Sequence, residues 1–132
     1  MYQYKAVIQK VVDGDTLEIA IDLGLSVWLH DEKIRLYGVN TPEVYGVKKG
    51  TPEWLKGSKV SEFVKSILKE KDEIIVETIK DKKEKYGRYL AVVYIKIDPA
   101  LLSGLMGVRS SGQYFCLNDI LIGKGLAESY MI

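Results

Sequence analysis

The sequence has a single cysteine, Cys116, and a single histidine, His30. One cysteine excludes an intramolecular disulfide and a cysteine-based zinc cluster. One histidine excludes most zinc sites and most catalysis by a histidine base. His30 stands in a polar stretch and is expected on the surface, whereas Cys116 precedes an apolar helical pattern and is expected in the core. Any chemistry therefore has to come from other side chains.

Arginine is also scarce, because only three of the 19 basic residues are arginines, namely Arg35, Arg88 and Arg109. With 18 acidic residues the formal net charge is +1, so no overall excess of positive charge indicates a nucleic-acid-binding protein. Lysine suffices for solubility, whereas arginine is the planar, bidentate partner of phosphate. We therefore interpret Arg35 and Arg88, which fall inside motifs, as residues required for their geometry.

The chain contains no long uncharged apolar run and no pattern typical of a leader. Its 132 residues are enough for one domain with a hydrophobic core, so we expect a single domain over 1–132. We expect a monomer that does not bind membranes. It is expected to be cytoplasmic or encoded by a phage or mobile element, and secreted only if a leader has been removed.

Alternation of apolar and polar residues predicts five strands, at 6–12, 17–22, 33–39, 73–79 and 89–97. Asp13-Gly14 predicts a tight turn between the first two strands. Polar stretches predict a turn at 30–33 and another at 80–85. Consecutive antiparallel strands at this spacing are typical of a small barrel.

A helix is predicted between the third and fourth strands, with Thr51 as its N-cap and Pro52 as its first residue. Its core-facing stripe consists of Val60, Phe63, Val64, Ile67 and Leu68. We interpret its lysines as a solvated face and not as a binding patch; they are Lys56, Lys59, Lys65 and Lys69.

A second, short helix is predicted at 117–122, ended by Gly123. Residues 98–115 form a loop insertion, either with a helical turn that packs on the barrel or as a flap that binds a partner. The predicted fold is α+β: a five-stranded OB-fold barrel with a helix between strands 3 and 4 and a short C-terminal helix.

The segment 35–43, Arg-Leu-Tyr-Gly-Val-Asn-Thr-Pro-Glu, begins as a strand and ends in a turn, because Pro42 cannot join the interior of a sheet. It brings a guanidinium (Arg35), a carboxamide (Asn40) and a carboxylate (Glu43) into one corner. Side-chain oxygens suit a hard divalent cation, and arginine suits phosphate.

Two further stretches add polar groups to this corner. Asp15 shares its parity with Leu17, so its carboxylate points inward and needs a cation or an arginine as partner. For Asp13, turn chemistry is a sufficient explanation. Arg88 follows Gly87 at the start of a strand, and it projects beside Arg35 if the two strand ends are neighbours.

Three pieces, Asp13-Gly14-Asp15-Thr16, the segment 35–43 and Lys85-Tyr86-Gly87-Arg88, resemble the staphylococcal nuclease (thermonuclease) family in order and spacing. The resemblance runs from about Val7 to Tyr130. It implies a calcium-dependent phosphodiesterase that acts on DNA and RNA with little sequence specificity. Such an enzyme cuts the P–O5′ bond and leaves 3′-phosphates.

The resemblance also implies residue roles. The metal ligands are Asp15, Asn40 and, through its backbone carbonyl, Thr41. The catalytic residues are Arg35 and Arg88, which hold the phosphate and stabilise the five-coordinate transition state, and Glu43, which positions or deprotonates the attacking water. The residues that contact a neighbouring phosphate and sugar are Lys85 and Tyr86.

The family usually has aspartate where this chain has Asn40. Asparagine offers an oxygen without a charge, so we expect weaker calcium binding or a different preferred divalent ion. An alternative is a weakened domain that binds nucleic acid or a protein without cleavage, but such a domain is expected to have lost Arg35, Glu43 or Arg88. A plain OB-type single-strand binder predicts a more basic groove. We therefore expect an active nuclease.

Overall fold

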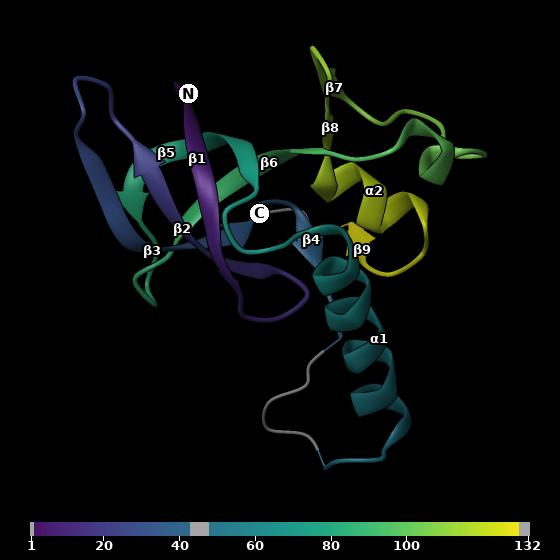
Figure 1. Ribbon diagram of the computed structural model, residues 1–132. Coiled ribbons are helices and arrows are strands. Elements are labelled where there is room, and N and C mark those ends of the chain that lie inside the picture. The colour runs from purple at the N-terminus through teal and green to yellow at the C-terminus, as the bar shows by residue number, and fades with distance from the viewer. Residues whose placement is uncertain (1, 43–47, 130–132) are drawn as a thin grey trace.

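Five long strands wrap into a barrel (Figure 1). The computed structural model describes residues 2–42 and 48–129, with the backbone alone at 80–82. The barrel strands are β1 (Tyr2–Val11), β2 (Thr16–Asp22), β3 (Trp28–Leu36), β5 (Glu73–Lys83) and β6 (Tyr89–Lys96). They follow the order β3-β2-β1-β5-β6, and a parallel pairing of β3 with β6 closes the barrel. The predicted α+β OB-fold barrel is confirmed.

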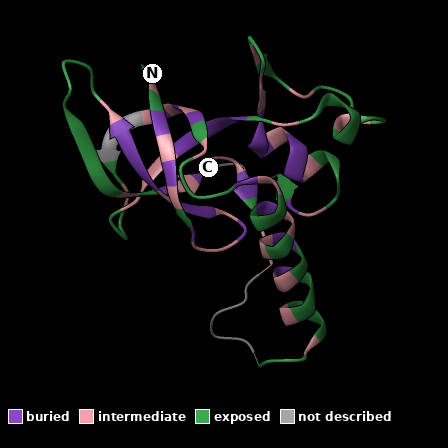
Figure 2. Ribbon diagram, in the orientation of Figure 1, coloured by how far each residue is buried: buried purple, intermediate pink, exposed green. Residues whose placement is uncertain are grey.

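The core lies inside the barrel because alternate residues of each strand point inward. Figure 2 shows buried residues along the strands and exposed ones on the hairpins. Among the fully buried side chains are Ile8, Leu17, Ile19, Ile34, Leu36, Ile74 and Ile95. Cys116 is also fully buried, as expected, and burial raises the pKa of its thiol to about 11, which keeps it protonated and unreactive at neutral pH.

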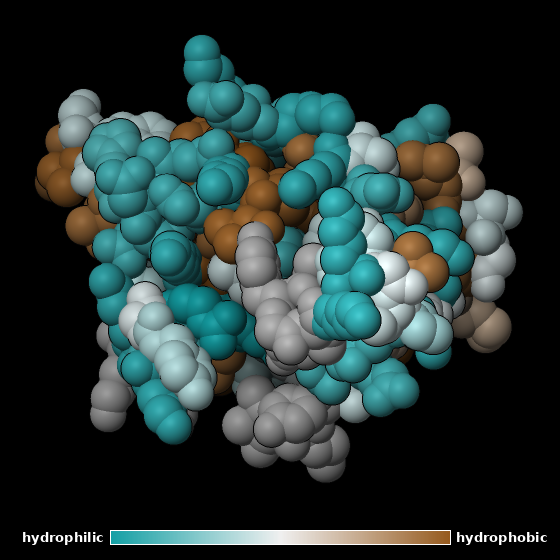
Figure 3. Space-filling model, turned by 90° about the horizontal axis from the view of Figure 1, so that it is seen from below, coloured by the Kyte–Doolittle hydropathy of each residue, from teal (hydrophilic) through white to brown (hydrophobic). Residues whose placement is uncertain are grey.

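Helix α1 (Pro52–Ile67) connects the short strand β4 (Val39–Asn40) to β5 and projects from the barrel (Figure 1). Its start is the predicted one, since the hydroxyl of Thr51 accepts a hydrogen bond from the Trp54 N–H at 3.3 Å. The predicted stripe is directed at the core, where Val60 and Val64 are fully buried. The face of the molecule toward which α1 projects is mostly hydrophilic (Figure 3). No helix in the described part of the chain is long and apolar enough to cross a membrane.

The insertion at 98–115 packs on the barrel. It contains a 3₁₀ turn, η1 (Pro99–Leu102), and the strands β7 (Ser110–Ser111) and β8 (Tyr114–Cys116). Strand β8 pairs with β6 and extends the sheet, while Leu102, Leu105 and Val108 contact the core. The helical turn expected in the first of the two alternatives is therefore present.

Helix α2 (Leu117–Gly123) follows β8 as predicted. The guanidinium of Arg109 donates to both carboxylate oxygens of Asp119, at 2.8 and 3.0 Å. Partial burial alone would raise the pKa of Asp119, but the hydrogen bonds and charge of Arg109 hold it below its ordinary value. This pair ties the insertion to α2.

The predicted turn at 30–33 is wrong, because these residues belong to β3. The turn lies at 23–27, where the Asp22 carboxylate accepts the Gly24 N–H at 2.8 Å and the Leu23 N–H donates to Val27 O at 2.9 Å. The polar residues mark a β-bulge instead: Asp31 has φ +60°, and the register with β2 shifts between Ile19 and Ile21. His30 is exposed, as expected.

Other strand bounds also differ from the prediction, and two of them lie close to the candidate site. β5 continues to Lys83, so the turn before β6 is shorter than 80–85 suggested. β3 ends at Leu36, because Gly38, with φ +72°, turns the chain. Val39–Asn40 then forms the short strand β4, which pairs with β9 (Glu128–Ser129).

Candidate active site

The β1–β2 hairpin holds Asp15 in place through its backbone. The Asp15 N–H donates to Asp13 Oδ1 at 3.0 Å, and the Asp15 carbonyl accepts the Leu36 N–H at 2.9 Å. Helix α1 packs directly on this turn, since a Cβ built on Gly14 would lie 2.5 Å from Val60 Cγ1. The turn is therefore fixed by β3 on one side and by α1 on the other.

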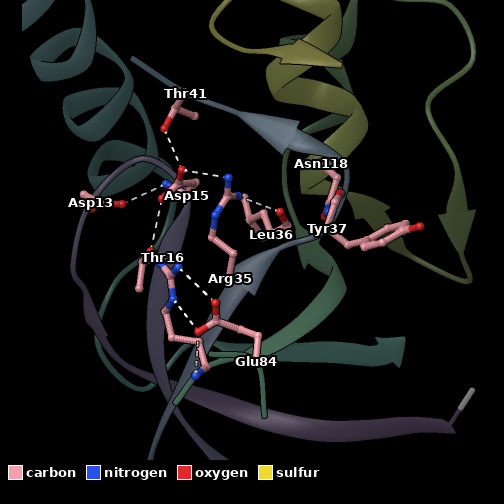
Figure 4. A network of polar contacts seen from close by, with 10 residues as sticks. Asp13, Asp15, Thr16, Arg35, Leu36, Tyr37, Thr41, Glu84 and Asn118 are labelled. Atoms are coloured by element: carbon pink, nitrogen blue, oxygen red, sulfur yellow. Dashed lines mark hydrogen bonds and ion pairs between the residues drawn. The ribbon is translucent and has the colours of Figure 1, made fainter. Parts of the chain in front are cut away.

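The carboxylate of Asp15 points inward, as its parity predicted, and contacts three side chains (Figure 4). Oδ2 lies 3.5 Å from Arg35 Nη2 and accepts the hydroxyl of Thr41 at 3.0 Å. Oδ1 accepts the hydroxyl of Thr16 at 3.1 Å. Arg35 in turn donates from Nη1 to the Leu36 carbonyl at 2.8 Å. The structure thus brings Asp15, Arg35 and Thr41 together.

Arg88 joins this group from the turn between β5 and β6. Its Nη1 donates to the Thr16 hydroxyl at 3.2 Å, so Thr16 connects Arg88 to Asp15. Glu84 orients the guanidinium, because its Oε1 accepts from Arg88 Nε at 3.1 Å and its Oε2 from Nη2 at 3.4 Å. Glu84 Oε1 also accepts the backbone N–H groups of Tyr86 and Arg88, at 2.9 and 3.0 Å, which closes the turn.

Lys85 and Tyr86 lie at the tip of this turn and are exposed, with Tyr86 at 70%. The Lys85 ammonium and the Arg88 guanidinium are 5.4 and 5.7 Å from the centre of the Tyr86 ring, within cation–π range. The ring is therefore held beside Arg88 while it remains accessible to a ligand.

Two carboxylates at the site have displaced pKa values. Burial, together with the neighbouring Asp15, raises the pKa of Asp13 to about 6. Partial burial alone would raise the pKa of Glu84, but hydrogen bonds from Arg88 and its charge hold that pKa below its ordinary value. Glu84 is therefore ionised at neutral pH and keeps Arg88 paired.

The atoms near Asp15 that could bind a metal ion are oxygens. Asp15 and Thr41 contact one another, and the Asp13 carboxylate lies on the same turn. Oxygen donors alone suit a hard divalent cation such as Ca²⁺ or Mg²⁺ better than zinc, whose protein sites usually include nitrogen or sulfur ligands. Among the side chains that the structure describes, no three of His, Cys, Asp or Glu converge as metal ligands do.

One predicted residue, Asn40, is described but is not joined to this network. Asn40 is exposed on β4, and in the described part of the chain no hydrogen bond connects it to Asp15. It lies in a groove together with Thr41. Glu43 lies outside the described residues.

Three contributors to the site were missed by sequence reasoning. Glu84 had a usable signal, because it stands four residues before Arg88 with the opposite charge. Thr16 gave none, since a threonine after a turn is ordinary strand chemistry. For Asn118 the signal was a polar side chain within an otherwise apolar helix. That side chain is buried, accepts the Val93 N–H at 3.0 Å and donates to Tyr37 O at 2.9 Å, which links the end of β3 to β6.

The structure is a closed OB-type barrel that carries two arginines and a carboxylate at adjoining strand ends, and the comparisons with known proteins support a nuclease-like domain. Comparison with known families agrees, because the model described as "Staphylococcal nuclease homologue" matches residues 33–132. The chain belongs to this family.

Three relatives illustrate the membership. An uncharacterized protein of Methanocaldococcus jannaschii is 39% identical over 97% of this chain and 60% of its own length. Endonuclease YhcR of Bacillus subtilis is 33% identical over 98% of this chain and 9% of its own length. The Thermonuclease of Staphylococcus intermedius is 39% identical over 67% of this chain and 47% of its own length. The chain thus spans less than two thirds of each relative.

Proposed function

We propose that this domain is a divalent-metal-dependent nuclease that hydrolyses phosphodiester bonds of DNA or RNA with little sequence preference. The observation that carries the proposal is the convergence of Asp15, Arg35 and Arg88 from three strand ends. Arg35 lies 3.5 Å from the Asp15 carboxylate, and Arg88 reaches it through the hydroxyl of Thr16. Relatives named endonuclease and thermonuclease support the reaction class.

The main difficulty of the reaction is that the negative charge of a phosphodiester repels nucleophiles, and the two arginines offset this charge. Arg35 is tied to the Leu36 carbonyl and Arg88 to Glu84, so both guanidiniums are oriented before substrate arrives. Donors fixed in advance stabilise the extra negative charge of the transition state without a cost of reorganisation. Their planar N–H groups also match phosphate oxygens in pairs.

We assign the cation site to Asp15, Asn40 and the backbone carbonyl of Thr41, with calcium or another divalent ion as the ligand. When bound, such an ion supplies positive charge beside the phosphate and a more acidic water. The ion pair between Asp15 and Arg35 is loose at 3.5 Å, so Asp15 keeps lone pairs for a further partner. The missing charge of Asn40 weakens the preference for calcium.

We assign to Glu43 the positioning or deprotonation of the attacking water. Attack on phosphorus and breakage of the P–O5′ bond leave a 3′-phosphate and a 5′-hydroxyl. Lys85 and Tyr86 contact a neighbouring phosphate and sugar, since both are exposed beside Arg88.

The test is digestion of single-stranded DNA with added calcium, with a chelator, and with the variant Glu43→Gln. Glu62→Gln is the matched control, because Glu62 is an exposed carboxylate on α1. Cutting with calcium that the chelator and Glu43→Gln abolish, and that Glu62→Gln retains, supports the proposal. Retained DNA binding without cutting in calcium, magnesium or manganese would refute it in favour of a domain that only binds.

A further inference from the structure

A groove of about 530 Å³ lies between α1 and the short sheet formed by β4 and β9. Its polar lining consists of Asn40, Thr41, Glu53, Lys56, Lys59 and Glu128. Val60 and Leu126 contribute apolar surface. A volume of this size lies in the range of small-molecule sites and has room for one nucleotide unit.

The groove is continuous with the candidate active site. Thr41 belongs to both, because it lines the groove and its hydroxyl donates to Asp15 Oδ2 at 3.0 Å. Val60 also belongs to both, because it lines the groove and packs on Gly14 of the Asp15 turn. A nucleic-acid strand held at Arg35 and Arg88 would therefore reach the groove by continuing past Thr41.

Lys56 and Lys59 provide the positive charge of the groove. They are one helical turn apart on α1, so they lie on the same face of the helix. Within the described residues neither ammonium group has a carboxylate within 4.0 Å, whereas Lys83 is 3.2 Å from Glu32 and Lys96 is 3.3 Å from Glu73. Both groove lysines are exposed and available for phosphate.

The carboxylates of Glu53 and Glu128 line the same groove and balance the two lysines. A groove with no net charge does not attract polyanions in general. Phosphates are favoured beside the lysines and disfavoured beside the carboxylates, which instead accept hydrogen bonds from sugar hydroxyl or base amino groups.

We propose that this groove is a second substrate subsite, in which Lys56 and Lys59 each contact a phosphate of the strand beyond the one that is cut. The inference rests on the proposed nuclease function and deepens it, because it makes a polymer, and not an isolated phosphodiester, the preferred substrate. It also replaces the interpretation of these two lysines as part of a solvated face.

The test compares Lys56→Gln/Lys59→Gln with the control Lys65→Gln/Lys69→Gln, which removes the same charge near the C-terminal end of α1 and outside the groove lining. Affinity for a labelled single-stranded oligonucleotide, long enough to span site and groove, is measured in chelator at several salt concentrations. For single strands, the logarithm of the binding constant falls linearly with the logarithm of the salt concentration, and each phosphate that a lysine neutralises makes the slope more negative by about 0.7. The plot for the groove variant should therefore be less steep than that for the control by about 1.4, because two such lysines are removed.

Cleavage with calcium provides a second readout. The groove variant should have a lower kcat/KM than the control on the oligonucleotide and the same kcat/KM on a dinucleotide, which has no phosphate beyond the one that is cut. An unchanged salt slope, or an equal decrease on both substrates, would overturn the subsite and leave the nuclease standing. If wild-type protein neither binds nor cuts nucleic acid, the proposed function fails and the subsite with it.

Discussion

From the close contact between Gly14 and Val60 we predict an effect on folding stability that does not depend on the proposed function. In Gly14→Ala the new Cβ meets Val60 Cγ1 at 2.5 Å and Val60 Cβ at 3.1 Å, and Val60 is fully buried. Overpacking of this kind costs about 1–3 kcal/mol. With an unfolding entropy of about 2.1 cal/mol/K per residue, a chain of 132 residues should lose roughly 4–11 °C in Tm.

A double-mutant cycle separates this clash from other effects. Val60→Ala removes the atom at 2.5 Å and keeps Cβ, so Gly14→Ala should cost less in the Val60→Ala background than in the wild type. Urea unfolding of the four proteins, followed by circular dichroism, measures the difference. Equal costs in both backgrounds would refute direct packing of α1 on the Asp15 turn.

Three other predictions concern the hydrogen bonds and charges of the site and of the insertion. Thr16→Val is nearly isosteric and removes the hydroxyl between Asp15 and Arg88. It should lower kcat for DNA cleavage about 10–100-fold while Tm changes little. An unchanged kcat would exclude this link. Asn40→Asp restores a charge and should tighten calcium binding about tenfold by titration calorimetry, and equal affinities would remove Asn40 from the cation site. Asp119→Asn weakens the contact with Arg109 and should cost about 1 kcal/mol at pH 7. The folded-state pKa of Asp119 lies below its ordinary value of 3.8, so this loss of folding stability is present above pH 3.8 and should disappear as the pH falls through the folded-state pKa. A loss that urea unfolding still measures below that pKa would contradict the ion pair.

Strand parity and helix capping, which act between neighbouring residues in the sequence, predicted two features of the fold correctly. The inward direction of Asp15 follows from strand parity, and the start of α1 follows from Thr51 and Pro52. The turn before β3 could not be read in the same way. Its tip residue, Leu25, is apolar and 99% exposed, whereas the polar residues that suggested a turn form a bulge around Asp31.

The long-range part of the site was only partly predictable. That Arg35 and Arg88 lie near one another could be expected from neighbouring strand ends, and the parallel pairing of β3 with β6 provides this proximity. The hydroxyl of Thr16 links Asp15 to Arg88 only because the β1–β2 turn and the β5–β6 turn lie side by side, and no sequence pattern encodes this link. The groove beside Lys56 likewise exists only because β9 returns to pair with β4.

The most direct test of the nuclease account is the position of the cut and the source of the new oxygen. A defined single-stranded oligonucleotide is digested with calcium in ¹⁸O-labelled water, and the fragments are weighed by mass spectrometry. Attack by water with loss of the 5′-oxygen predicts one ¹⁸O atom in a new 3′-phosphate, and Arg35→Gln and Arg88→Gln should both suppress this product. Label in a 5′-phosphate, or intact oligonucleotide with every divalent ion tried, would contradict the account.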